Sequence, residues 1–152
     1  MSENIELWKK FLATMIPTLG VADSSVARKG MEETLALLDP DFVCPAAFSI
    51  PHGGVWRGHE GFVKMGETFR EAWIHHGSSH EFFDLGDGRI LIIIEPTFES
   101  KATGETITHK MIEIVTFRDG KITEIVPYYW DTVPLVEAGG GVVEAPWLEA
   151  KR

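Results

Sequence analysis

The sequence predicts an α+β fold, in which three helices precede a run of antiparallel strands. In the first half of the chain, apolar residues recur at spacings of three and four in three separate stretches. In the second half, apolar and polar residues alternate between glycine-containing turns, and Asp-Gly at 119–120 is a strong hairpin signal. Helices followed by a meander indicate α+β rather than a doubly wound α/β fold.

Breaking and capping residues bound the three helical stretches. The first carries its apolar stripe over residues 5–16 and is closed by Pro17. The second begins at the serine pair 24–25, either of which is a good N-cap, and stops before Pro40. The third follows the loop GGVWRG and ends at His75-His76-Gly77. Its stripe consists of Phe62, Met65, Phe69 and Trp73.

The expected strands span residues 41–49, 80–85, 89–99, 106–118 and 121–131. The first lies between the second and third helices, and the other four form the meander. These elements make one domain, residues 1–136. The remaining residues, 137–152, form a glycine-rich and then amphipathic tail, expected to be a frayed end or an arm onto a neighbouring subunit.

Composition excludes several classes of function. A chain of 152 residues with 44% hydrophobic residues is long enough to bury a real core. Its net charge of −9 comes without a basic patch, so nucleic acid and anionic membrane are not expected partners. The single cysteine, Cys44, excludes an intrachain disulfide and a cysteine-based metal site. The N-terminus has no signal-peptide pattern, and the longest apolar run, residues 90–94, is too short for a membrane span; we expect a cytoplasmic protein.

Three motifs resemble those of the SnoaL-like family within the nuclear transport factor 2-like superfamily. They are LDPDFV at 38–43, VWRGHEGF at 55–62 and FRDGKITEIVPYYWD at 117–131. The resemblance implies a curved antiparallel sheet wrapped around helices, a cone with a central apolar pocket, and a homodimer. Relatives include polyketide cyclases, ketosteroid isomerases and limonene-epoxide hydrolases, besides ligand carriers without chemistry, so the fold alone does not give the function.

The resemblance also exposes departures from the family's catalytic pattern. SnoaL-like cyclases carry a catalytic aspartate on the last strand, at the position that Pro127 occupies in this chain. The stretch IIIEPTFE lacks the arginine of the epoxide hydrolases' Arg-x-Asp pair. Ketosteroid isomerases have an aspartate in a D-P-x-G loop; the similar turn in this chain is IPHGG, with His52 near that position.

Two candidate residues share one face of the strand 106–118. Alternation puts His109 and Glu113 on the same face as Val115 and Phe117, which we expect in the core. The two candidates lie roughly 13 Å apart along the strand, so a substrate could bridge them although they cannot touch. Alternatively, Glu113 lies at the sheet edge or pairs across strands.

Glu95 and His52 are further candidates, each with a plain alternative. Glu95 follows five apolar residues, so it is either functional or marks where its strand reaches solvent. His52 lies in a Pro-His-Gly-Gly turn at the expected mouth of the pocket, and it is either a proton donor or an ordinary surface histidine.

The orientation of Tyr129 and Asp131 depends on the register of the last hairpin. A two-residue turn at 119–120 sets Glu113 opposite Val126, whereas a three-residue turn with a glycine bulge sets it opposite Ile125. The second register, or a bulge at Pro127, directs Tyr129 and Asp131 into the pocket. We favour this inward orientation.

The predicted function is cofactor-free acid–base catalysis on a small apolar cyclic or polyketide-like substrate: isomerisation, cyclisation or dehydration. Glu113 or Asp131 is the expected base, His109 or His52 the proton donor, and Tyr129 the hydrogen-bond donor to an oxyanion. The alternative is a module of the same fold that binds a hydrophobic ligand or dimerises without chemistry. An outer sheet face that includes Ile112, Ile114 and Ile125 fits a dimer. No nucleotide, flavin or metal is expected, because no phosphate-binding loop follows a strand and His75, His76 and His80 match no metal motif.

Overall fold

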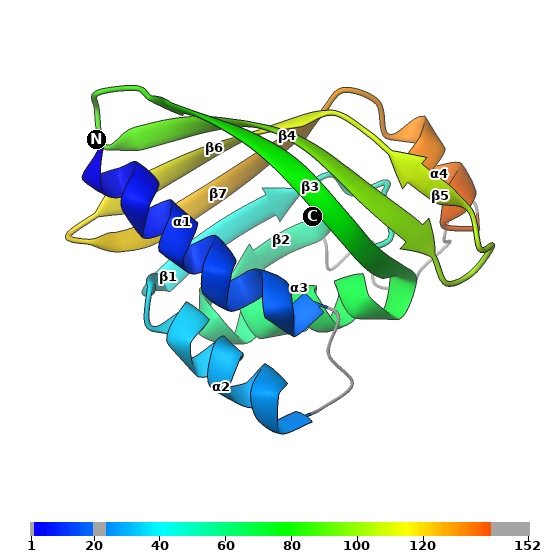
Figure 1. Cartoon of the computed structure of the whole chain (residues 1–152), viewed down its shortest axis with the longest axis horizontal. Coiled ribbons are helices and arrows are strands. Elements are labelled where there is room, and N and C mark those ends of the chain that lie inside the picture. Colours follow the sequence, from blue (N-terminus) through cyan, green and yellow to red (C-terminus); the bar gives the residue numbers. More distant parts are fainter. Residues whose placement is uncertain (1, 20–23, 141–152) are drawn as a thin grey trace.

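The computed structural model describes residues 2–19 and 24–140, which form a curved seven-stranded sheet with four α-helices and one 3₁₀ turn (Figure 1). The α-helices are α1 (Glu3–Met15), α2 (Ser24–Leu35), α3 (Gly58–Ala72) and α4 (Val133–Ala138), and the 3₁₀ turn is η1 (Ile16–Leu19). The strands are β1 (Leu38–Ala46), β2 (Gly54–Arg57), β3 (Trp73–Asp84), β4 (Arg89–Ser100), β5 (Thr106–Thr108), β6 (Met111–Arg118) and β7 (Lys121–Tyr129). The predicted α+β class is confirmed.

The sheet has the strand order β2-β1-β7-β6-β4-β3, with β5 paired to β4. All pairs are antiparallel except β1 with β7. The predicted four-strand meander is therefore confirmed as β3, β4, β6 and β7. Three elements differ from the prediction: the loop GGVWRG contains β2, His75 and His76 lie within β3 instead of at a helix exit, and the predicted strand 106–118 is divided into β5 and β6. The helix α3 ends at Ala72, and the backbone of the next residue, Trp73, is extended at φ −133° and ψ 151°.

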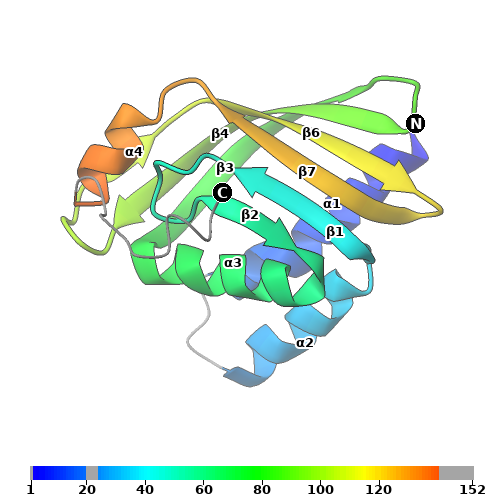
Figure 2. The same ribbon diagram turned by 180° about the vertical axis from the view of Figure 1, so that it is seen from behind.

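Three helices lie on the concave side of the sheet, as the two opposite views show (Figures 1 and 2). Trp8 and Phe11 of α1 and Phe62 of α3 are buried in the main core with Phe42 of β1. Pro17 interrupts the first helix as predicted, and the chain continues there as η1. Among residues 2–19 and 24–140, no helix is long and apolar enough to cross a membrane.

A second core cluster closes one end of the sheet. It contains Trp73 and Phe98 together with Leu135 and Ala138 of α4, both fully buried. The helix α4 therefore continues past residue 136, the predicted end of the domain. Residues 141–152, which include most of the predicted tail, lie outside the described residues.

The last hairpin combines a tight turn with a bulge. Asp119 and Gly120 both have positive φ, 52° and 71°, as a type I′ turn requires, and Arg118 pairs with Lys121. Phe117 pairs with Ile122, but the next pair is Thr116 with Glu124, so Thr123 is an extra, bulged residue. Neither predicted register holds along the whole hairpin. Beyond the bulge, Glu113 lies opposite Pro127.

Candidate active site

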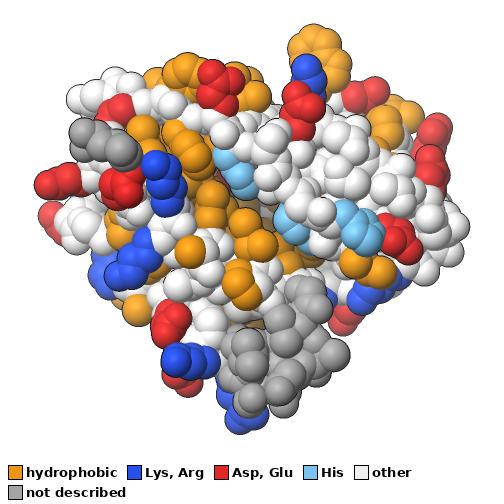
Figure 3. Space-filling model, in the orientation of Figure 1, with side chains coloured by type: hydrophobic (Ala, Val, Ile, Leu, Met, Phe, Trp, Pro, Cys, Tyr) orange, Lys and Arg blue, Asp and Glu red, His pale blue; other side chains and the backbone are white. Residues whose placement is uncertain are grey.

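A cavity of about 190 Å³ lies between the concave face of the sheet and the helices α1 and α3. Most of its wall is apolar, with Phe11, Phe62, Phe69 and Ile125 among the lining residues. Ile125 thus faces inward, and its predicted place on the outer face is wrong. The polar and ionisable side chains of the wall are Thr18, Cys44, His52, Arg70, His75, Ser78, His80, Glu113 and Tyr129. Figure 3 shows an orange-lined hollow bordered by histidine side chains.

Glu113, in the middle of β6, is the carboxyl group of this cavity. Its cross-strand neighbours are Ile92 on β4 and Pro127 on β7, and the flanking Met111 and Val115 are buried. No described residue forms a hydrogen bond or ion pair with the carboxyl group. Burial in these surroundings raises the pKa of Glu113 to about 7, because the ionised form loses its hydration without gaining a partner. The group can therefore act as acid or base near neutral pH.

His52 links a tryptophan to a tyrosine. The indole Nε1 of Trp73 donates a hydrogen bond to Nδ1 of His52 at 3.1 Å, and Nε2 of His52 lies 3.1 Å from Oη of Tyr129. Because an indole N–H can only donate, Nδ1 of His52 is the acceptor, and the neutral ring carries its proton on Nε2. His52 therefore donates to Tyr129, and the hydroxyl proton of Tyr129 is not used in this contact.

The turn between β1 and β2 fixes His52 in a buried position. His52 is only 7% exposed, so it is not a surface histidine. A Cβ atom at Gly53 would lie 1.8 Å from the carbonyl oxygen of Ala47, so this close approach requires glycine. The indole Nε1 of Trp56 donates a hydrogen bond to the backbone oxygen of His52 at 3.2 Å. The tryptophan of the VWRGHEGF motif thus holds the backbone of a cavity residue.

Tyr129, at the end of β7, faces the same cavity as Glu113, as predicted. Burial, together with the nearby Glu113 carboxyl and Cys44 thiol, raises the pKa of the Tyr129 hydroxyl above its ordinary value. The hydroxyl is therefore protonated at neutral pH and can donate a hydrogen bond to a ligand.

His109 lies between the strands β5 and β6 instead of within one strand as predicted, and its ring packs against that of Tyr129, outside the cavity wall. Its ring stacks on that of Tyr129 at a centroid distance of 5.8 Å and meets the edge of Phe98 at 5.0 Å. Both ring nitrogens are buried without a hydrogen-bond partner among the described residues. Burial lowers the pKa of His109 to about 4, so the ring is neutral at pH 7. The predicted contact of His109 with a substrate is not supported by this position.

Asp131 lies outside the cavity, contrary to the prediction. The strand β7 ends at Tyr129, and the chain then turns toward α4. The exposed carboxylate of Asp131 accepts a hydrogen bond from the backbone N–H of Val133 at 2.9 Å. The bulge that resets the alternation lies at Thr123, upstream of Pro127, and it orients alternate side chains inward as far as Tyr129. Because the strand ends there, the alternation does not extend to residue 131.

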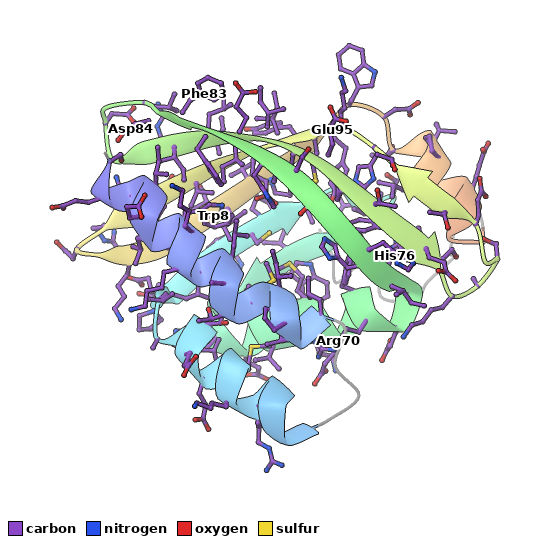
Figure 4. All side chains as sticks on the ribbon, viewed as in Figure 1. Trp8, Arg70, His76, Phe83, Asp84 and Glu95 are labelled. Atoms are coloured by element: carbon purple, nitrogen blue, oxygen red, sulfur yellow. The ribbon has the colours of Figure 1, made fainter. Side chains whose placement is uncertain are left out.

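Glu95 also lies outside the cavity, on the outer face of β4 (Figure 4). Its side chain is 43% exposed, and its Oε1 lies 3.4 Å from Nζ of Lys110. The inward positions of this strand belong to Ile92, Ile94 and Pro96, which are buried. Of the two interpretations of Glu95, the structure agrees with the solvent-reaching one.

Two residues of the site, Trp73 and Arg70, are not among the functional residues predicted from the sequence. Trp73 belongs to an apolar helical stripe, and its polar N–H gives no separate signal. Arg70 follows Phe62, Met65 and Phe69 at helical spacing, so a charge on an apolar stripe is the signal that could have found it.

Within the described residues, no group of three or more His, Cys, Asp or Glu side chains could hold a metal ion. The histidines of β3 have separate partners. Nε2 of His76 lies 2.7 Å from Oε2 of Glu99, and Nε2 of His80 lies 3.2 Å from Oγ of Ser78.

Residues 22–125 match the family model of the SnoaL-like domain. The chain belongs to the SnoaL-like family. The motifs that carried the resemblance have structural roles in this SnoaL-like protein: His59 of VWRGHEGF donates a hydrogen bond to the backbone oxygen of Leu38 in LDPDFV at 3.0 Å. No curated protein matches the sequence significantly.

Solved structures agree with this family assignment at the level of fold. The SnoaL-like protein is similar to an NTF2-like protein from Burkholderia xenovorans, at 26% identity and a TM-score of 0.73, over 90% of this chain and 95% of the other. It resembles TerC, co-crystallised with polyporic acid, at 23% identity and a TM-score of 0.66, over 92% and 100%. A candidate SnoaL-like polyketide cyclase from Mesorhizobium loti matches at 23% identity and a TM-score of 0.61, over 85% and 100%.

Proposed function

We propose that this protein is a cofactor-free acid–base enzyme that moves a proton next to a carbonyl group of a small apolar cyclic substrate. One observation carries the proposal. An unpaired carboxyl group, Glu113, with a pKa raised to about 7, shares an apolar cavity with a tyrosine hydroxyl whose proton is available to a ligand. A base whose pKa lies near the working pH is well suited to proton abstraction.

In the proposed step, the Glu113 carboxylate removes a proton from the carbon next to the carbonyl. The electron pair of that C–H bond forms a C=C bond, and the carbonyl oxygen takes the negative charge. Tyr129 donates a hydrogen bond to this oxyanion, while His52 donates to Tyr129 and so strengthens it as a donor. Protonated Glu113 then returns the proton to another carbon, which gives an isomer. Alternatively, the enolate attacks a second carbonyl of the substrate and the resulting alkoxide takes the proton from Glu113, which gives a cyclisation. If the enolate instead expels a β-hydroxyl group, that group takes the proton from Glu113 and leaves as water, which gives a dehydration.

The dimensions and polarity of the cavity support an apolar substrate of one or two rings. A cavity of about 150 Å³ lined by apolar side chains holds benzene in another protein, and this one is of similar size, about 190 Å³. The fold similarity to TerC, which was crystallised with polyporic acid, and to a candidate polyketide cyclase is consistent with such a ligand.

A second candidate function is hydrophobic-ligand binding without chemistry. The observation that favours it is Pro127, which lines the cavity at the position where SnoaL-like cyclases carry an aspartate. The acid–base proposal differs by placing the carboxyl group across the hairpin, on Glu113, which pairs with Pro127. A protein that only binds its ligand needs no ionisable group at residue 113.

Hydrogen–deuterium exchange separates the two functions. The wild-type protein is expected to accelerate exchange of the α-protons of 1-tetralone in D₂O, followed by proton NMR. Glu113→Gln is expected to lower the rate by at least about 10²-fold, the lower bound for loss of a general base. Tyr129→Phe is expected to lower it by about 10²-fold, through loss of a hydrogen bond to the developing charge.

Matched controls come from the same sheet. Glu95→Gln and Tyr128→Phe change a carboxyl and a tyrosine on the outer side of the sheet, where Glu95 is 43% and Tyr128 54% exposed, and both should exchange at the wild-type rate. Exchange in Glu113→Gln as fast as in wild type would contradict the acid–base proposal and favour the binding function.

A further inference from the structure

Arg70 is a charged residue on an otherwise apolar face of α3. Together with Phe62, Met65, Gly66 and Phe69, it lines the cavity, at the spacing expected for one side of a helix. Figure 4 shows it near the end of α3, beside the C-terminal end of α1. A guanidinium group at such a position loses hydration, and it normally recovers this loss through a carboxylate partner.

No such partner exists among the described residues. Arg70 is half-buried, and its side chain forms no ion pair or hydrogen bond there. The backbone of the preceding turn leaves it room: a Cβ atom at Gly66 would lie only 3.3 Å from a terminal nitrogen of Arg70. The guanidinium therefore lies along α3 over a residue without a side chain, at the cavity wall, and no described residue accepts a hydrogen bond from it.

The charges around the cavity make Arg70 distinctive. Burial lowers the pKa of both His75 and His80, so these lining histidines are neutral at pH 7. Arg70 is then the one lasting positive charge among the described residues of the wall, and Glu113 is the one carboxyl group. The two come from different elements, α3 and β6, so the cavity is electrically polarised.

We propose that the substrate carries a carboxylate group on its apolar ring system, and that Arg70 binds this carboxylate while Glu113 faces the reacting carbon. The proposal rests on the cavity being the substrate site of the proposed function. A planar guanidinium matches a carboxylate through two parallel N–H···O hydrogen bonds. Repulsion from the ionised Glu113 disfavours the reverse orientation. A single guanidinium in an apolar cavity fits one negative charge better than a phosphate, which needs several donors.

The test measures binding without turnover. Two probes of equal size are titrated into isotope-labelled protein by NMR: 4-ethylbenzoate, which is anionic, and 4-ethylbenzamide, which is neutral. Arg70→Gln is expected to weaken benzoate binding by about tenfold, as loss of a charge-assisted bidentate pair predicts. Benzamide binding should change by less than about twofold, because the neutral probe gains little from the charge.

Lys64→Gln is the matched control, because it removes an exposed positive charge from the same helix outside the cavity wall. It should leave both affinities unchanged. Equal changes for the two probes in Arg70→Gln, no change for either, or no binding of either probe to the wild type would each overturn the proposal. Failure of the proton-exchange test with intact benzoate selectivity would instead contradict the proposed chemistry alone.

Discussion

Glu95 of β4 and Glu113 of β6 lie on neighbouring strands and each directly follows an isoleucine in the sequence, yet they lie on opposite faces of the sheet. The side chain of Glu95 is 43% exposed and lies within 3.4 Å of a lysine, whereas Glu113 faces an apolar cavity and has no ion-pair partner among the residues that the structure describes. Burial raises the pKa of Glu113 to about 7. A carboxyl group in an apolar sequence is thus unusual only when its side chain also faces inward.

The reason for the difference is the phase of each strand. In β4, the run ILIII places isoleucine on both faces, so the sequence contains no alternation that would orient Glu95. In β6, the inward positions of Val115 and Phe117 orient Glu113. The two carboxyl groups should therefore respond differently to pH and to substitution.

The free energy of unfolding should depend on the ionisation of Glu113. The folded-state pKa of Glu113, about 7, lies above its ordinary value of 4.5, so ionisation destabilises the fold. The cost is absent below pH 4.5, grows between pH 4.5 and 7, and then stays constant at up to about 3 kcal/mol. Urea unfolding at pH 4.5, 6 and 8 should therefore show Glu113→Gln gaining stability over wild type as pH rises. The free energy of unfolding of Glu95→Gln should follow that of the wild type at each pH. If the free energy of Glu113→Gln instead changed with pH in parallel with that of Glu95→Gln, the raised pKa assigned to Glu113 would be refuted.

His109 should shift the free energy of unfolding in the opposite direction with pH. Its folded-state pKa of about 4 lies below the ordinary 6.5, so its contribution to stability is complete above pH 6.5 and is lost as the pH falls toward 4. His109→Phe removes this titration together with two unpaired buried nitrogens. From pH 7 to 4.5, the wild type should lose about 2 kcal/mol relative to this variant. His76→Phe, which changes an exposed histidine of β3, serves as the control. If this variant altered the loss of stability between pH 7 and 4.5 more than His109→Phe does, the prediction would be refuted.

We expect the outer face of the strands β4, β6 and β7 to form a homodimer interface, which remains a proposal. Ile93, Ile112 and Tyr128 are large apolar or aromatic residues that are 36%, 38% and 54% exposed there. Tyr128→Glu should convert a dimer into a monomer in light scattering, while changing the free energy of unfolding of the isolated chain by less than about 0.5 kcal/mol. Tyr128→Phe should remain dimeric. A wild type that is monomeric at high concentration would contradict the proposal.

Local signals are enough to predict the fold class, the meander and the family. Alternating strands and the 119–120 turn depend on neighbouring residues, and both are confirmed. The strand β2 escapes prediction because four residues, GVWR, carry too little alternation. The start of β3 is not predicted because Trp73 packs in the second core cluster, whose residues come together only in the folded chain.

The site is predictable in part for similar reasons. Glu113 and Tyr129 line the cavity because strand alternation holds near them, and His52 lines it through a turn that glycine signals. The prediction for Asp131 is wrong because no sequence pattern shows that β7 ends at Tyr129. The role of Trp73 cannot be read from the sequence, since its hydrogen bond to His52 joins residues 21 positions apart.

The bulge at Thr123 has a consequence for how this cavity could change in evolution. One extra residue allows Ile122 and Ile125, three positions apart, both to face inward, and it increases the local twist of β7. Deleting Thr123 would restore regular alternation while every inward side chain kept its direction. A single-codon deletion would thus flatten the wall without changing any residue on it. The volume of the cavity can therefore be altered separately from its chemistry, a route to new substrates that leaves Glu113 and Tyr129 in place.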